Sequence, residues 1–304
     1  MYPIETPQVS TQLLNQTFFE MLERGETEKV AEAGNPLVRV VVRQASAARE
    51  IITPEPIGAA DLSEWPDSDQ LMKFMDIEPN SVATAVQFYG TPKTRFYYQR
   101  KVPVFFGQLQ SDEFTKNIFE LMTYKNDVRK LLADNATFDI ADQEDVALRR
   151  ACVLGVNRNP VVQRTSVSKL TATAWAMGTR AVYDRRLMVG KALMCKSRHT
   201  DLIDLPATVV GDDIAKEHYH EGLDKETGLW GTPVVTTLKS DIYLPDEAWL
   251  FPPTAYLGKF WVLRDATLYV EQKGAWIKFY VYSSIGIGLA NTNGIQQFSF
   301  TARN

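Results

Sequence analysis

Residues 231–260 read GTPVVTTLKSDIYLPDEAWLFPPTAYLGKF. Short runs of β-branched and aromatic residues alternate here with proline and other turn residues, which is the pattern of strands joined by tight connections. The stretch contains neither histidine nor cysteine, and its polar residues form no evident catalytic motif. It therefore indicates a β-rich platform, and the purpose of that platform has to be sought in the rest of the chain.

The strand-and-turn texture extends well beyond this stretch. From about residue 207 to the C-terminus, runs such as FWVLRDATLYVEQ and WIKFYVYSSIGIGLAN are rich in strand-forming residues and are separated by turns. Gly286 and Gly288 in the second run lack the third glycine and the following helix of a dinucleotide-binding fingerprint. Glycines inside a strand more often mark a bulge or a close approach of two backbones.

Three helices are predicted between residue 111 and this β-rich part, so the fold class is α+β. The first helix is predicted over residues 111–134, with Ser111 as its N-cap and an amphipathic 3.6-residue period. Its predicted core residues are Phe114, Ile118, Leu121 and Leu131. A second helix is predicted at about residues 142–154, and a third is predicted to begin near Thr165.

Residues 1–36 look like an arm. Leu14 and Phe18 lie on the apolar face of a short amphipathic helix that Gly25 is expected to end. So short a helix needs a partner surface to be stable, in this chain or in another. Residues 38–43 alternate well enough to predict a strand, and the proline-rich residues 53–80 predict loops.

A long basic β-hairpin is predicted around the turn YGTPKT at residues 89–94. Its basic residues are Lys93, Arg95, Arg100 and Lys101. Aromatic residues interleave with these cations, as in an arm that binds nucleic acid. The alternatives are a solvated hairpin and an assembly arm that lies on a neighbouring subunit. Assembly is favoured, because the stretch GAADLSEWPDSDQ supplies acidic complements, among them Asp61 and Glu64.

Catalytic and metal-binding motifs are sparse in this sequence. His218 and His220 could share a metal ion on a strand but not on a helix, and no third ligand is evident. Neighbouring carboxylates such as Glu144 and Asp145 point apart in regular structure. No P-loop, nucleophile elbow or C-x-x-C motif occurs. We therefore expect neither an enzyme nor a cofactor, and a metal-dependent enzyme using the two histidines remains the least favoured alternative.

The composition narrows the remaining function classes. A net charge of −4 argues against sequence-independent binding of nucleic acid by the whole chain, because neutralising phosphates requires a basic surplus. The two cysteines, Cys152 and Cys195, lie among apolar neighbours and fit a reducing compartment. The N-terminal residues do not resemble a signal peptide, and no run of about 18 apolar residues predicts a membrane span.

The order of these parts resembles that of the major capsid proteins of tailed bacteriophages, which have the Hong Kong 97-type fold. Residues 95–146 look like the end of an extended loop, a spine helix and the acidic ED segment that follows it. Residues 231–260 look like the strands that leave the axial domain for the peripheral domain, and residues 277–300 look like the closing strands. The resemblance also implies that Gly258 allows two strands to approach closely.

The resemblance implies five parts of the chain. They are an N-terminal arm (1–36), an extended loop region with a β-hairpin (37–108), a spine helix with the start of the peripheral domain (109–160), an axial domain (161–232) and a β-rich return to the peripheral domain (233–304). The residues expected at contacts between subunits are Lys93, Arg95, Arg100, Lys101, Leu14, Phe18, Asp61 and Glu64.

The function implied is that of a non-enzymatic shell subunit. Pentamers and hexamers would assemble in the host cytoplasm into the icosahedral capsid of a virion and enclose double-stranded DNA, which they contact without sequence specificity. Scaffold, portal and decoration proteins are implied as further partners, and no membrane or cofactor is implied. The alternative on the same fold is an encapsulin-type nanocompartment that holds cargo enzymes.

Overall fold

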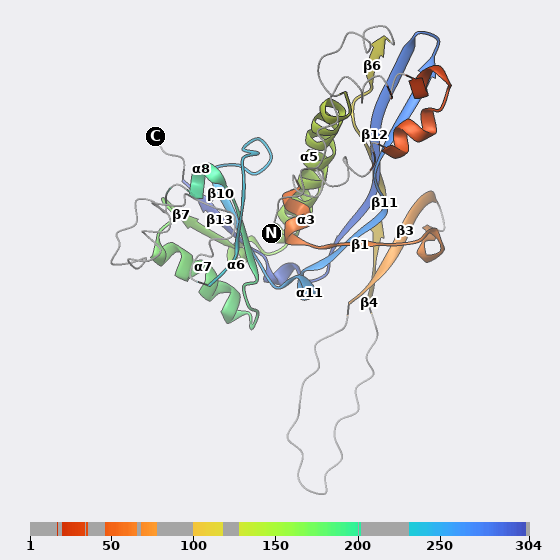
Figure 1. Cartoon of the computed structure of the whole chain (residues 1–304). Coiled ribbons are helices and arrows are strands. Elements are labelled where there is room, and N and C mark those ends of the chain that lie inside the picture. The colour runs from red at the N-terminus through yellow and green to blue at the C-terminus, as the bar shows by residue number, and fades with distance from the viewer. Residues whose placement is uncertain are drawn as a thin grey trace, which may run out of the picture.

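The computed structural model describes residues 17, 20–33, 35, 46–65, 68–77, 100–117, 128–199, 201 and 231–301. Within these residues the strands form three sheets (Figure 1). A long ribbon of strands runs beside helix α5, a second body is built around β8, β10 and β13, and a hairpin of β3 and β4 lies near the lower end of the ribbon in Figure 1.

The first sheet, sheet A, has the order β1-β11-β12-β5, and β6 also pairs with β12. Its centre is an antiparallel hairpin of β11 (Gly258–Lys273) and β12 (Trp276–Leu289). Gly274 turns this hairpin at a φ of 64°, a left-handed conformation that favours glycine. The remaining strands of sheet A are β1 (Pro54–Pro56), β5 (Gly107–Gln110) and β6 (Phe114–Asn117).

Helix α5 (Val128–Val156) is one continuous helix of 29 residues that packs on β12. The two helices predicted at 111–134 and 142–154 are therefore wrong in their boundaries, because residues 128–134 and 142–154 belong to the same helix. The polar stretch between the two predictions stays helical since Ile140 and Ala141 are fully buried within it. No helix in the described ranges is long and apolar enough to cross a membrane.

The start of the predicted 111–134 helix is a strand instead. Phe114 lies on β6, whose residues pair with Trp276–Phe279 of β12, and its half-buried side chain packs against the core of sheet A. Ser111 caps no helix, because its Oγ accepts a hydrogen bond from the Val281 backbone N–H at 2.9 Å. A long neighbouring strand supplies ladder partners here, and this tertiary pairing outweighs the local helical pattern.

The second sheet, sheet C, has the order β7-β13-β10-β8-β9. Its strands are β7 (Arg164–Val167), β8 (Lys191–Cys195), β9 (Val234–Thr237), β10 (Glu247–Phe251) and β13 (Gln296–Phe300). These strands come from both sides of the predicted domain boundary at residues 232 and 233, so that boundary does not separate two folding units. β8, which precedes the predicted boundary, lies in the sheet between β9 and β10, which follow it.

Short helices accompany sheet C. They are α6 (Pro160–Gln163), α7 (Ala172–Asp184) and α8 (Lys196–His199). Helix α7 begins after Thr171, whose side chain caps it, so the predicted start near Thr165 is wrong. Residues 164–167 are a strand instead because they pair in parallel with β13. Trp175 of α7 stacks on Phe298 of the sheet in the core of this body.

The third sheet, sheet B, has the order β2-β3-β4 and includes part of the second run of the predicted hairpin. Its strands are β2 (Ser63–Trp65), β3 (Ser68–Ile77) and β4 (Arg100–Phe105). β3 and β4 are antiparallel, with Ile77 opposite Arg100. β4 falls within the second run of the predicted hairpin, whereas its first run and its turn at residues 89–94 lie outside the described residues. The prediction of loops over residues 53–80 is wrong at β3, because pairing with β4 supplies the strand with its partners.

Several shorter elements join the three sheets and the N-terminal region. They are α3 (Ala47–Ile51), the 3-10 helices η1 (Ala59–Asp61) and η3 (Thr292–Gly294), and α11 (Thr254–Leu257). Nearer the N-terminus, Leu22 and Val30 are fully buried on the β11–β12 core. Gly25 ends the first helical turns at a φ of 72°, as predicted. The strand predicted at 38–43 lies outside the described residues.

The reactivity of the two cysteine thiols provides a test of the core packing. Cys152 and Cys195 are free and buried, and burial raises the pKa of the Cys152 thiol well above its ordinary value. Because the thiolate is the reactive form, we expect both thiols to react with a thiol reagent at least about 100-fold more slowly in the native subunit than in denaturant. Reaction at the denatured rate under native conditions would contradict this packing.

Candidate assembly site

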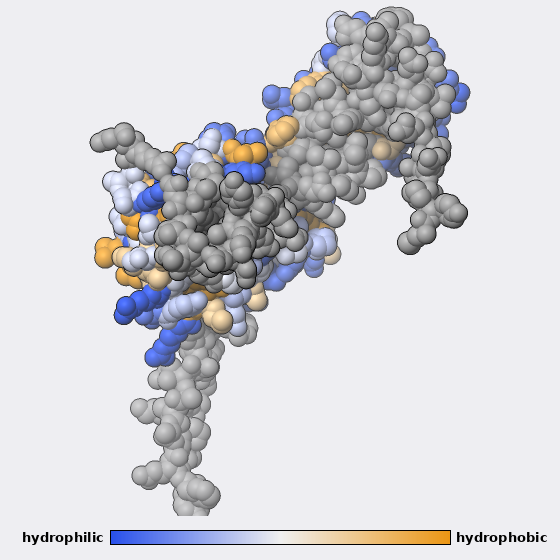
Figure 2. All heavy atoms as spheres, turned by 60° about the vertical axis from the view of Figure 1, so that its left-hand side comes forward, coloured by the Kyte–Doolittle hydropathy of each residue, from blue (hydrophilic) through white to orange (hydrophobic). Residues whose placement is uncertain are grey.

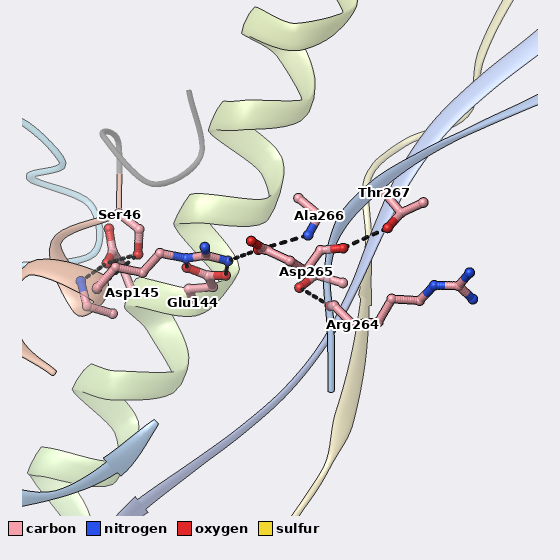
Figure 3. A network of polar contacts seen from close by, with 10 residues as sticks. Ser46, Glu144, Asp145, Arg264, Asp265, Ala266 and Thr267 are labelled. Carbon is pink, nitrogen blue, oxygen red and sulfur yellow. Dashed lines mark hydrogen bonds and ion pairs between the residues drawn. The ribbon is translucent and has the colours of Figure 1, made fainter. Parts of the chain in front are cut away.

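A buried ionic network joins three parts of the chain that are far apart in sequence. Nε and Nη2 of Arg49, on α3, donate to the Glu144 carboxylate of α5 at 2.8 and 2.7 Å. Nη2 also donates to Oδ1 of Asp265, on β11, at 2.9 Å. Figure 3 shows these carboxylates converging on one guanidinium group. We call this set of residues, with Asp145 and Lys239, the junction.

The charges of the junction are nearly removed from water. Arg49 is 6% exposed and Glu144 is 0% exposed. Burial by itself lowers the pKa of Arg49, but the hydrogen bonds and charges of Glu144 and Asp265 outweigh it and hold that pKa above its ordinary value. A buried ion pair of this kind stays charged only because each partner has the other.

Asp145 points to a different set of partners from its neighbour Glu144. Its Oδ1 accepts from the Ala48 backbone N–H at 2.7 Å, and its Oδ2 accepts from Lys239 Nζ at 2.5 Å. Burial raises the pKa of Asp145 above its ordinary value, although Lys239 opposes that shift. The two consecutive carboxylates thus take different partners: both tie α3 to α5, and Asp145 also holds Lys239.

The same helix is also tied to sheet C. Arg149 of α5 donates from Nε to Glu247 Oε1 of β10 at 2.6 Å. Gln297 of β13 donates to the other oxygen of Glu247 at 3.2 Å. Helix α5 therefore contacts sheet A through apolar packing, and it is joined to sheet C by this ion pair and by the apolar cluster that Leu148 shares with Trp249.

The hairpin base is seated on β12 through a small apolar cluster. Val104 of β4 and Met75 of β3 pack with Trp261 of β11. A Cβ placed on Gly288 would lie 2.4 Å from Val104 Cγ2, so only glycine leaves room for the hairpin there. A Cβ on Gly258 would lie 2.1 Å from the backbone oxygen of Gly288. Both glycines thus mark close approaches, as the sequence predicted.

A groove of about 1100 Å³ lies beside this seat, between β4, the C-terminal half of α5 and the end of β12. Apolar side chains line it, among them Leu154 of α5 with Ile287 and Leu289 of β12. Lys101, Arg150 and Arg158 add basic groups to its lining. The groove combines an apolar surface with positive charge and contains no catalytic constellation.

The predicted contact residues fall partly within the described chain. Asp61 is exposed at the end of η1, Glu64 lies on β2, and Arg100 and Lys101 begin β4. Leu131 lies on α5. The predicted residues outside the described ranges are Leu14, Phe18, Lys93, Arg95, Ile118, Leu121, His218 and His220. Among the residues that are described, no group of three or more metal-ligating side chains occurs.

The junction was not predicted from the sequence. A signal was present, because Glu144 and Asp145 fall at helical spacing with Ala141, Leu148 and Cys152, all of which are buried on α5. Carboxylates on an apolar helix face require partners, since burying an unpaired charge is costly. The pattern therefore indicates a buried ionic contact, although it does not say which cations supply it.

Figure 2 shows one face of the molecule in space-filling form. On the body built around sheet C, apolar and charged side chains are interspersed, and they do not gather into one large apolar patch in this view. This mixed surface differs from the groove, where apolar and basic residues are brought together from three elements.

Comparison with solved structures decides the fold. The chain is similar to a virus-like particle from Pyrococcus furiosus (TM-score 0.56, 15% identity), over 88% of this chain and 98% of that one. It is similar to the mature capsid of bacteriophage PhiM1 (TM-score 0.59, 9% identity), over 85% of this chain and 88% of that one. It is also similar to the capsid of Cyanophage P-SCSP1u (TM-score 0.60, 10% identity), over 85% of this chain and 89% of that one.

The chain has the Hong Kong 97-type capsid fold. The fold that the sequence resemblance implied is thus confirmed. No protein-family model and no curated protein matches the sequence, so the likeness lies in the structure. Within the Hong Kong 97-type fold, the junction and the hairpin seat are the features that hold the long ribbon, the helix and the hairpin together.

Proposed function

We propose that this protein is the major capsid protein of a tailed bacteriophage, whose pentamers and hexamers form an icosahedral shell around double-stranded DNA. The observation that supports this function is the likeness to capsid structures over most of both chains. A shell subunit needs a rigid body and surfaces for repeated symmetric contacts, and it needs no reactive centre. The junction and the groove meet these needs.

The three sheets support a proposed assignment of domains. In this proposal, sheet A with α5 is the peripheral domain, and sheet C with α7 is the axial domain. The hairpin of β3 and β4 is the base of the extended loop, and residues 1–36 are the N-terminal arm. The axial domain then includes β9, β10 and β13 in addition to the strands before residue 232.

The subunit contacts are proposed from the charges of the extended loop. Lys93, Arg95, Arg100 and Lys101 would meet acidic residues of a neighbouring copy such as Asp61 and Glu64. Leu14 and Phe18 of the arm would bury their apolar face on another copy. Packaged DNA would touch the inner face without sequence specificity, in a virion assembled in the host cytoplasm with scaffold, portal and decoration proteins.

Electron microscopy of the purified recombinant chain, beside size-exclusion chromatography, tests this function. We expect uniform hollow shells or rings of five and six copies. Shells isolated from the native source should contain DNA that a nuclease does not reach. A protein that stays monomeric at every concentration and salt condition, with and without co-expressed scaffold, portal and decoration proteins, would contradict the proposal.

A second candidate is an encapsulin-type nanocompartment. It is supported by the likeness to the virus-like particle from Pyrococcus furiosus, which the chain covers over 98% of its length. The contents of native shells separate the two candidates. Protected double-stranded DNA of uniform length favours the phage capsid, whereas a stoichiometric protein cargo without DNA favours the nanocompartment.

A further inference from the structure

The groove beside the hairpin seat is lined by apolar side chains that are incompletely buried. Leu154, which projects from α5 into its lining, is 59% exposed although it is a large apolar side chain. Ile287 and Leu289 of β12, also in the lining, are only half-buried. Their incomplete burial means that a partner seated in the groove would remove further apolar area from water.

The charge of the groove restricts the partner. Lys101, Arg150 and Arg158 are exposed, and none of their side chains forms an ion pair with another described residue. Among the described residues that line the groove, none is a carboxylate. A segment that combines apolar and acidic side chains would therefore satisfy both the surface and the charge of the groove.

The opposite edge of sheet B carries a segment of this kind. The sheet order β2-β3-β4 leaves β4 at the edge beside the groove and β2 at the other edge. Figure 1 shows β3 on the side of β4 that faces away from α5. Residues 59–65, which run from η1 into β2, contain two carboxylates, Asp61 and Glu64, and no basic residue. Within them the sequence DLSEW, residues 61–65, combines two acidic residues with the apolar residues Leu62 and Trp65.

We propose that the groove binds residues 61–65 of a second copy of this chain. This contact rests on the proposed function, and it specifies which two surfaces of neighbouring copies meet. We take the contact as heterologous, so that the groove of each copy receives the acidic edge of the next copy and the copies are joined head to tail. A repeated head-to-tail contact closes into a ring if the rotation between copies closes, and rings of five and six copies are what the proposed shell requires.

Two charge-reversed variants test the contact. The groove variant carries Arg150→Glu with Arg158→Glu, and the edge variant carries Asp61→Lys with Glu64→Lys. Each places like charges opposite each other, so we expect each alone to lower the yield of rings and shells at low salt at least about tenfold. A chain with all four substitutions should recover assembly, because the charges are again complementary.

Mixing the two variants gives a sharper result. The acidic groove of the groove variant can bind only the basic edge of the edge variant, and the basic groove of the edge variant can bind only the acidic edge of the groove variant. The two variants must therefore alternate around a head-to-tail ring. Only rings with an even number of copies can alternate, so hexamers should form whereas pentamers and closed shells should not. Pentamers that contain both variants would overturn the head-to-tail contact.

A matched control carries Arg180→Glu with Lys196→Glu, which changes the net charge as the groove variant does. Both residues are exposed on the body built around sheet C, away from sheet B. Unchanged assembly is expected for this control, and native thiol protection verifies that each variant folds. If the wild-type chain assembles and both charge-reversed variants assemble as well as it does, this inference is overturned while the proposed function stands. If the wild-type chain never assembles, the proposed function itself fails.

Discussion

Replacing Glu144 with alanine is expected to lower the free energy of unfolding of the subunit by about 3–5 kcal/mol. The substitution leaves the Arg49 guanidinium buried at 6% exposure with only Asp265 as a charged partner. The cost comes mainly from the charge that stays buried without its bidentate partner. Urea unfolding of the unassembled subunit, followed by fluorescence or by thiol exposure, measures the change.

An exposed ion pair provides the control for this prediction. Lys259 and Glu55 join β11 and β1, with side chains 46% and 47% exposed. Because water screens such a pair, Glu55→Ala should cost no more than about 1 kcal/mol. A double variant with Arg49→Met and Glu144→Leu should lose less stability than Glu144→Ala, since it removes the charges on both sides of the bidentate pair. Equal losses for Glu144→Ala and Glu55→Ala would show that the junction does not hold the subunit together.

Replacing Gly258 with alanine is expected to cost about 3 kcal/mol, at the upper end of the usual cost of overpacking. The new Cβ would lie 2.1 Å from the Gly288 oxygen and 2.9 Å from the Leu289 Cα. Both are backbone atoms of the paired strand, so no side chain can rotate away and β11 must separate from β12 at this point. Thermal or urea unfolding of the unassembled subunit measures the loss.

Gly107 provides the matched control for Gly258. It also lies in sheet A, on β5, but a Cβ added there meets no atom within 4 Å. Gly107→Ala should therefore change stability by less than about 0.5 kcal/mol. A Gly258→Ala variant as stable as Gly107→Ala would mean that the two strands do not approach as closely as the structure has them.

Features that depend on one residue or on a short run could be predicted from the sequence. Gly25 ends a helix because its left-handed φ is unfavourable for other residues. Gly258 marks a close approach to the backbone of β12, and Gly288 marks a close approach to the Val104 side chain. The strand-and-turn texture of residues 231–300 and the order of parts along the chain were sufficient to indicate the Hong Kong 97-type fold.

Tertiary structure decided the features whose partners are distant in the sequence. Residues 114–117 have a helical pattern but form β6, because the ladder to β12 outweighs a propensity of a few tenths of a kcal/mol per residue. Glu144 was visible as a carboxylate on an apolar helix face, but its partner Arg49 is 95 residues away and was not. The groove likewise needs three elements brought together. The sequence by itself determined which local structures were possible, and the long-range contacts decided among them because they supply most of the stabilising energy.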